Sequence, residues 1–198
     1  MTKDANGDGM IDDRDTWKVI HRKEQFRSLT QDPSPPHRLI GIPEVFSTLQ
    51  QSRQGETMVA PYEVPFVASV PTLAEMALGA LNILGKNPRG LFLMVEGGAI
   101  DWAAHGNQSG RLIEEVIAFN QAVEAVVGWI EKNSGWNDTL LIVTADHETG
   151  YLTGPGSGVE GLGAAWYPLR SNGTGKMPEM QWNTRGHTNS LVDRKSVV

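Results

Sequence analysis

The fold is decided by the segment Leu91-Phe-Leu-Met-Val-Glu96-Gly-Gly-Ala-Ile-Asp101-Trp-Ala-Ala-His105 and by the segment Leu140-Leu-Ile-Val-Thr-Ala-Asp146-His147-Glu148-Thr149-Gly150. Each segment is a short apolar run that ends in acidic and imidazole side chains. Apolar runs of this length, bounded by turn residues, predict buried strands. In α/β proteins the binding groups lie on loops beyond the carboxyl ends of such strands. The pattern therefore predicts an α/β sheet that presents a metal site.

A long amphipathic segment joins the two runs. Apolar residues recur at helical spacing between Ser109 and Lys132, at Leu112, Val116, Phe119, Val123, Val126 and Ile130. A one-sided apolar stripe of this kind predicts a helix packed on the core. This helix would return the chain for a parallel strand at Thr139–Ala145. Strand, crossover helix and strand form a right-handed βαβ unit, and we assign residues 71–150 to this metal-site core.

Weaker patterns surround that core. Thr72 and Glu75 have the spacing of a capping box, which predicts a helix that starts there and stops at Gly85. Upstream, the sequence predicts a weakly periodic helix over Thr16–Leu29, a short strand over Leu39–Ile42 and a short helix over Glu44–Ser52. The Gly-rich segment 151–186 lacks periodicity and is predicted to form a surface excursion or lid.

Composition limits the classes of function. The 198 residues suit one domain, and 39% hydrophobic with 20% charged residues is typical of a soluble protein. A formal net charge of −6 argues against a nucleic-acid partner. No apolar run approaches the roughly 18 residues that span a bilayer, so no membrane partner is expected. Because the chain has no cysteine, any transition metal must be held by nitrogen and oxygen ligands.

The candidate ligands are carboxylates and imidazoles. Asp101 and His105 are four residues apart, which places both on one side of a helical turn where they can hold one ion. Taken alone, this pair occurs often by chance, and an isolated Asp146-His147 is more often a buried ion pair or a helix cap than a metal site. One further imidazole, His187, follows a glycine near the end of the chain.

Three motifs together resemble the carboxyl-terminal half of alkaline phosphatase. They are Val95-Glu96-Gly97-Gly98-x-Ile100-Asp101-x-x-x-His105, Thr144-Ala145-Asp146-His147-Glu148-Thr149-Gly150 and Gly186-His187-Thr188-Asn189. The resemblance covers at least residues 71–192, and we assign residues 1–198 to one partial alkaline phosphatase domain. It implies a three-layer α/β/α alkaline-phosphatase-like sheet that is incomplete, since the amino-terminal half of the fold is missing.

The resemblance also implies roles for these residues. One zinc would be held by Asp101, His105 and His187, a second zinc by Asp146 and His147, and a magnesium by Glu96. The family hydrolyses phosphate monoesters through a phosphoserine. Nitrogen with carboxylate ligands suits zinc, whereas an oxygen-only set suits magnesium.

The nucleophile of the family lies in an Asp-Ser-Ala motif, and this sequence contains no Asp-Ser pair. We therefore expect the catalytic serine upstream of Met1 and expect the chain alone to be inactive. We do not assign Ser109, Ser190 or Arg111 to the missing roles. By resemblance, the location is periplasmic or secreted and a homodimer is compatible with the family. No signal peptide is visible, because polar turn residues follow Met1 at once.

Residues 1–15 contain a separate motif. The spacing D-x-N-x-D-G-x-I-D-x-x-D is typical of a calcium loop, with ligands at Asp4, Asn6, Asp8, Met10, Asp12 and Asp15. An Asn/Asp/Gly turn without calcium explains the same residues equally well. Two alternatives to alkaline phosphatase therefore stay open. One is another member of its superfamily (sulfatase, phosphodiesterase or phosphoglycerate mutase), and the other is a non-catalytic calcium-binding module.

Overall fold

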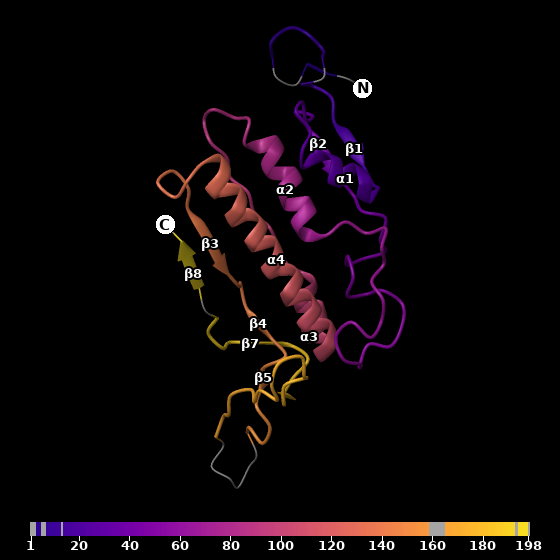
Figure 1. The fold of residues 1–198 in the computed structure, drawn as a ribbon, viewed down its shortest axis with the longest axis vertical. Helices are drawn as coiled ribbons and strands as arrows, with labels where there is room; N and C mark the ends of the chain where they lie inside the picture. The colour runs from indigo at the N-terminus through magenta and orange to yellow at the C-terminus, as the bar shows by residue number, and fades with distance from the viewer. Residues whose placement is uncertain (1–2, 5–6, 13, 159–164, 193, 198) are drawn as a thin grey trace. The chain divides into compact units, whose positions relative to one another are not determined.

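The computed structural model describes residues 3–4, 7–12, 14–158, 165–192 and 194–197 (Figure 1). The chain divides into two compact units, and each is described by itself. The first unit comprises Met1–Arg53, Phe66–Gly97 and Val116–Gly135; the second comprises Gln54–Pro65, Gly98–Glu115 and Trp136–Val198.

The first unit is built on two short strands, two helices and the part of α4 (Ser109–Asn133) from Val116 onward. Strand β1 (Lys18–Ile20) pairs in parallel with β2 (Leu39–Gly41). Helix α1 (Lys23–Leu29) packs against α2 (Leu73–Leu84) (Figure 1). The core consists of the buried residues Ile20, Phe26 and Leu29, against which Leu39, Met76 and Ile83 pack. Burial of these apolar side chains is the main stabilising term of the unit.

Helix α2 begins with the predicted capping box. The Thr72 hydroxyl accepts from the backbone N–H of Glu75 at 3.1 Å, and the Glu75 carboxylate accepts from the N–H of Thr72 at 2.9 Å. These bonds satisfy two backbone donors that a helix start otherwise leaves unpaired. Arg27 of α1 also donates to Glu75, at 2.9 Å. The same carboxylate therefore caps α2 and ties α1 to it.

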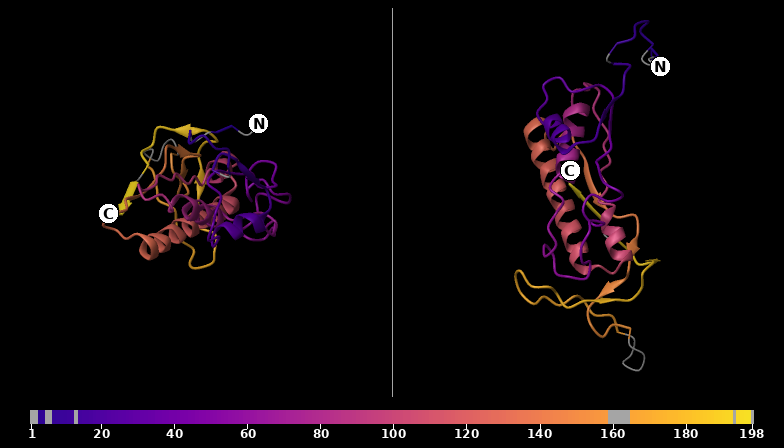
Figure 2. Two further views of the ribbon diagram at one scale, coloured as in Figure 1. Left: turned by 90° about the horizontal axis from the view of Figure 1, so that it is seen from above. Right: turned by 90° about the vertical axis from the view of Figure 1, so that its right-hand side faces the viewer.

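The second unit contains α3 (Ala99–His105) and the first turns of α4 (Ser109–Asn133). The six strands among its described residues form three antiparallel pairs: β3 (Leu141–Thr144) with β8 (Arg194–Val197), β4 (Glu148–Thr149) with β7 (His187–Thr188), and β5 (Leu152–Thr153) with β6 (Gln181–Trp182). The Gly-rich segment thus includes one strand pair, and the described residues between β5 and β6, 154–158 and 165–180, form no helix (Figure 2). Among the described helices, none has the length and apolar character needed to cross a membrane.

Several predicted elements are confirmed. Helices α2, α3 and α4 and strands β2 and β3 lie where the sequence places them. Each has a local cause: the capping box starts α2, and the apolar stripe gives α4 a face to pack. The most useful of these for the site is α3, because it contains both Asp101 and His105.

The strand predicted at Leu91–Val95 is wrong for the described residues. Residues 91–97 have no regular structure, and Phe92 and Met94 are 88% and 77% exposed. A strand exists only where a neighbour pairs with its N–H and C=O groups, and no described strand pairs with this segment. The parallel βαβ unit therefore does not form, and β3 pairs antiparallel with β8 instead.

The helix predicted at Glu44–Ser52 is also wrong, since these residues form bends and turns. Here the Thr48 hydroxyl accepts from the backbone N–H of Ser52 at 2.8 Å. Serine and threonine side chains compete in this way with helical backbone bonds. Over Thr16–Leu29, only the part from Lys23 onward is helical, because β1 takes up the preceding residues to pair with β2.

The pKa of Glu75 generates a stability prediction. Burial raises this pKa, but the bonds from Thr72 and Arg27 outweigh burial and hold it below its ordinary value. A carboxylate with a lowered folded pKa stabilises the fold above its unfolded pKa of about 4.3, and this contribution is lost as the pH falls through the folded pKa. We expect Glu75→Gln to cost up to about 1 kcal/mol near neutral pH, because glutamine can still complete the capping box but loses the ion pair with Arg27.

Thermal unfolding at neutral and acidic pH tests this expectation. The difference between wild type and Glu75→Gln should shrink below the ordinary glutamate pKa. Glu131→Gln, which removes an exposed carboxylate of α4, serves as the control and should show little change. An unchanged difference for Glu75→Gln at acidic pH would contradict the assignment.

Candidate metal centre

The predicted ligands come from three elements of the second unit. Asp101 and His105 lie one turn apart in α3. His147 directly precedes β4, and His187 is the first residue of β7. Strands β4 and β7 pair with Thr149 opposite His187, and α3 contacts β4 (Figure 1). The pairing therefore brings residues far apart in sequence to one place.

Three ligand atoms converge within this group. Oδ1 of Asp101 lies 3.4 Å from Nε2 of His105 and 3.4 Å from Nε2 of His187. The two imidazole nitrogens are 3.1 Å apart. Ligand atoms at about 2.0–2.1 Å from a tetrahedral zinc lie about 3.3–3.4 Å from one another. The triangle therefore has the size of one face of a zinc tetrahedron, and these residues fit a metal ion.

The second predicted pair lies beside this triangle. Oδ2 of Asp146 is 3.3 Å from Nε2 of His147, again the separation of two ligands on one ion. The rings of His147 and His187 stack with centroids 3.6 Å apart. Ligand atoms of Asp101, His147 and His187 all lie within 4.8 Å of one another. The two predicted ligand sets are therefore neighbours.

Outer hydrogen bonds fix the orientation of the imidazoles. Nδ1 of His105 donates to the carbonyl of Arg185 at 2.5 Å, so Nδ1 carries the proton. In a neutral ring this leaves a lone pair on Nε2, the atom that faces Asp101 and His187. A backbone carbonyl on the far nitrogen is the usual outer partner of a metal-binding histidine.

Sequence reasoning missed two residues of the site, Glu148 and Thr149. The Glu148 carboxylate accepts from the backbone N–H of Tyr151 and from the hydroxyl of Thr188, which ties β4 to β7. The Thr149 hydroxyl contacts both Asp101 and His147. Neither residue is a predicted ligand, and no spacing rule marks them. Their position between Asp146-His147 and Gly150 was the one available indication.

Glu96, the predicted magnesium ligand, is exposed and belongs to the first unit. Its assignment stays a prediction. Arg111 is 2% exposed and forms an ion pair with Glu114 at 3.6 Å, in the second unit. Glu114 is thus its ion-pair partner, and the exclusion of Arg111 from the phosphate-binding role stays a prediction.

The calcium-like loop contains a positively charged side chain, Arg14, among its carboxylates. Arg14 contacts the carboxylates of Asp8 at 2.6 Å and Asp12 at 2.5 Å, and its hydrogen bonds to Asp12 hold the pKa of that carboxyl below its usual value. The Asp4 carboxylate accepts from the N–H groups of Gly7 and Gly9. Of the remaining predicted ligands, Met10 and Asp15 are described, whereas Asn6 lies outside the described residues. Calcium binding stays a prediction.

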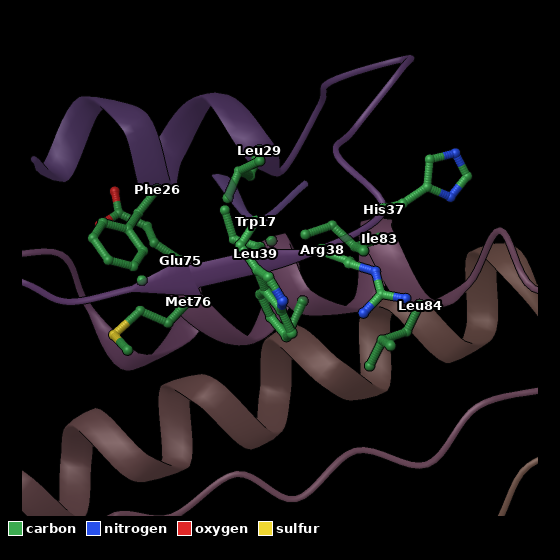
Figure 3. Close-up of a pocket in the computed structure, with 13 residues that line it drawn as sticks. Trp17, Phe26, Leu29, His37, Arg38, Leu39, Glu75, Met76, Ile83 and Leu84 are labelled. Atoms are coloured by element: carbon green, nitrogen blue, oxygen red, sulfur yellow. The ribbon is translucent and has the colours of Figure 1, made fainter. Parts of the chain in front are cut away.

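A pocket of about 400 Å³ lies in the first unit (Figure 3). Apolar side chains of α1, β2 and α2 line it, among them Phe26, Leu29 and Met76. His37, Arg38 and Glu75 supply its polar atoms. None of the predicted metal ligands lines this pocket, so it is separate from the metal-binding chemistry.

Comparison with known proteins establishes the family. The model of the alkaline phosphatase family matches residues 8–196, and the chain belongs to this family. The chain is similar to alkaline phosphatase 4 of Bacillus subtilis, with 43% identity over 86 residues, which cover 43% of this chain and 18% of that protein. It is also similar to the tissue-nonspecific alkaline phosphatase of Felis catus, with 31% identity over 147 residues, 72% of this chain and 25% of that protein. The matched region thus spans a quarter or less of these two relatives.

Solved structures confirm the fold class, a partial alkaline-phosphatase-like α/β fold. A cold-active alkaline phosphatase from Shewanella sp. has a TM-score of 0.61 and 23% identity, over 91% of this chain and 53% of that one. A mutant of the TAB5 alkaline phosphatase, solved with magnesium bound, has a TM-score of 0.57 and 20% identity, over 92% of this chain and 45% of that one. The chain therefore spans about half of these solved structures.

Metal binding is directly testable. We expect the 198-residue chain to retain zinc after dialysis and His105→Ala to lose most of it, because one corner of the ligand triangle is removed. His37→Ala is the matched control, since His37 lies in the first unit. Elemental analysis of the dialysed proteins measures the zinc content. Equal zinc contents in the two variants would contradict the proposed zinc site.

The calcium loop generates a second expectation. Calcium must displace Arg14 from Asp8 and Asp12, so we expect weak binding, roughly 10⁻⁴–10⁻³ M, and tighter binding in Arg14→Ala. Terbium luminescence excited through Trp17 measures it. Lys86→Ala removes the same charge elsewhere and should leave the affinity unchanged. Equal affinities of these two variants would speak against the loop, as would saturation that persists in Asp4→Ala/Asp8→Ala.

Proposed function

We propose that this chain supplies the metal-ligand part of a phosphomonoesterase active site. The observation that supports this most is the triangle of Asp101, His105 and His187, whose ligand atoms are 3.1–3.4 Å apart. Membership of the alkaline phosphatase family supports a phosphatase-type hydrolase with phosphate monoesters as substrates.

The proposed ligand sets are those of the sequence prediction. Asp101, His105 and His187 hold one zinc, Asp146 and His147 contribute to a second, and Glu96 contributes to a magnesium site. Two such ions, when bound, stabilise the charge on the attacking and leaving oxygens of a phosphoryl transfer. The contribution of this chain is to hold its ligand atoms in place before the substrate arrives. The bond from His105 to the Arg185 carbonyl supports that role.

The nucleophile is the serine of an Asp-Ser motif, and this motif does not occur in the 198 residues. We propose that a matching amino-terminal segment provides the serine, together with the missing metal and phosphate ligands. Phosphoryl transfer depends on positioning and charge stabilisation by all of these groups together. Removal of one member of such a set can cost almost as much as removal of the whole set.

Hydrolysis of p-nitrophenyl phosphate tests this proposal. With zinc and magnesium added, the 198-residue chain alone should stay near background. Co-expression with the amino-terminal half of a related alkaline phosphatase should produce activity, and His147→Ala should abolish it. His37→Ala in the same complex should retain activity, because His37 lies in the first unit and is not among the proposed ligands.

Two results would contradict the proposal. If the isolated chain turned over the ester at typical enzyme rates, and lost this in His147→Ala, a nucleophile would have to lie within these residues. If the complex bound zinc normally but hydrolysed no phosphate monoester, the site would serve a different reaction of the superfamily.

A further inference from the structure

The Thr149 hydroxyl lies between the two ligand sets. Its oxygen is 2.6 Å from Oδ1 of Asp101, a ligand of the first set, and 3.2 Å from Nδ1 of His147, a ligand of the second. The backbone of Thr149 pairs with that of His187 across β4 and β7. One short side chain thus contacts both sets. It belongs to β4, whose position is fixed by its pairing with β7.

The directions of these hydrogen bonds follow from counting protons. A hydroxyl has one proton to donate, and an ionised carboxylate has none, so Thr149 donates to Asp101. The remaining contact then requires Nδ1 of His147 to donate to Thr149. The carbonyl of Glu148, 3.3 Å from the same nitrogen, can only accept as well. Both neighbours of Nδ1 therefore require it to carry the proton.

This proton position determines what His147 offers to a metal. With the proton on Nδ1, Nε2 of the neutral ring has a free lone pair, and Nε2 is the atom 3.3 Å from Asp146. The bond from Thr149 also occupies one of the two lone pairs of Asp101 Oδ1, which leaves the other for a metal ion held with His105 and His187. The hydroxyl thus orients one ligand in each set.

We propose that Thr149 is a positioning residue that couples the two ligand sets, by donating to Asp101 and by holding His147 as the Nδ1–H tautomer. The inference rests on the proposed function, since it takes both sets to be metal ligands. Thr149 touches no substrate in this role and acts only through Asp101 and His147. Outer partners of this kind are typically worth about 10–100-fold in metal affinity.

Thr149→Val and Thr149→Ser in the full 198-residue chain separate the hydroxyl from the shape of the side chain. Valine keeps the branched shape and loses the hydroxyl, whereas serine keeps the hydroxyl. Thr144→Val is the matched control, because the exposed hydroxyl of Thr144 donates only to the adjacent carbonyl of Ala145. Circular dichroism establishes that the variants are folded.

Two measurements detect the effect of removing the Thr149 hydroxyl. Nitrogen-15 NMR of the metal-free chain identifies the tautomer of His147. Chelator-competition titration with zinc alone gives the affinity. We expect Nδ1–H in wild type, Thr149→Ser and Thr144→Val. In Thr149→Val only the carbonyl of Glu148 still favours Nδ1–H, so we expect a larger share of the Nε2–H tautomer and an affinity about 10–100-fold lower.

The outcomes separate this inference from the proposed function. A wild-type chain that binds no zinc overturns both. If wild type binds zinc and Thr149→Val matches it in tautomer and affinity, the inference alone fails. A Thr149→Ser variant as weak as Thr149→Val also overturns it, because the hydroxyl would then not be the group that matters.

Discussion

The candidate site depends on the pairing of β4 with β7. This ladder has two residue pairs, Glu148 with Thr188 and Thr149 with His187, and it joins segments 40 residues apart. So short a ladder contributes little by itself, since strand pairs need further packing to persist. Glu148 strengthens it with its side chain, which accepts from Thr188 and from the backbone of Tyr151. Without this pairing, His187 would have no fixed position relative to His147.

Close packing on the other side of β4 fixes the position of α3. Gly150, directly after β4, has a φ of +86°, and a Cβ there would meet the ring of Trp182 at 2.5 Å. Trp182 in turn donates to the hydroxyl of Ser109 at 2.9 Å. Ala103 and Ala104 of α3 are 0% and 3% exposed, so the small residues of this helix face inward. Ala104 lies one turn from Asp101 on the same side of α3, so its burial helps to hold Asp101 beside Thr149 of β4.

The parts of this structure that the sequence predicts are those with local causes. A capping box and an apolar stripe act within one helix, so α2 and α4 are correct, and i, i+4 spacing places Asp101 and His105 together. Strand prediction fails where the outcome depends on a partner. Leu91–Val95 has a suitable composition, but no described strand pairs with it. Glu44–Ser52 fails because serine and threonine hydroxyls bond the backbone in ways that helical periodicity does not consider.

The predictions for the site divide in the same way, into features with local causes and features that depend on the folded chain. The motifs predicted which residues would be ligands, because nitrogen and carboxylate oxygen at these spacings suit a metal. They did not identify Glu148 and Thr149, whose importance comes from distances between β4, β7 and α3 that exist only in the folded chain. Metal ligands must be held close together although the carboxylate and the imidazole lone pairs repel one another without an ion. Hydrogen bonds on the far side of each ligand offset that repulsion. The carbonyl of Arg185 does so for His105, and Thr149 does so for Asp101 and His147 together. The ligand triangle can therefore exist before an ion binds, and binding needs less rearrangement of the chain.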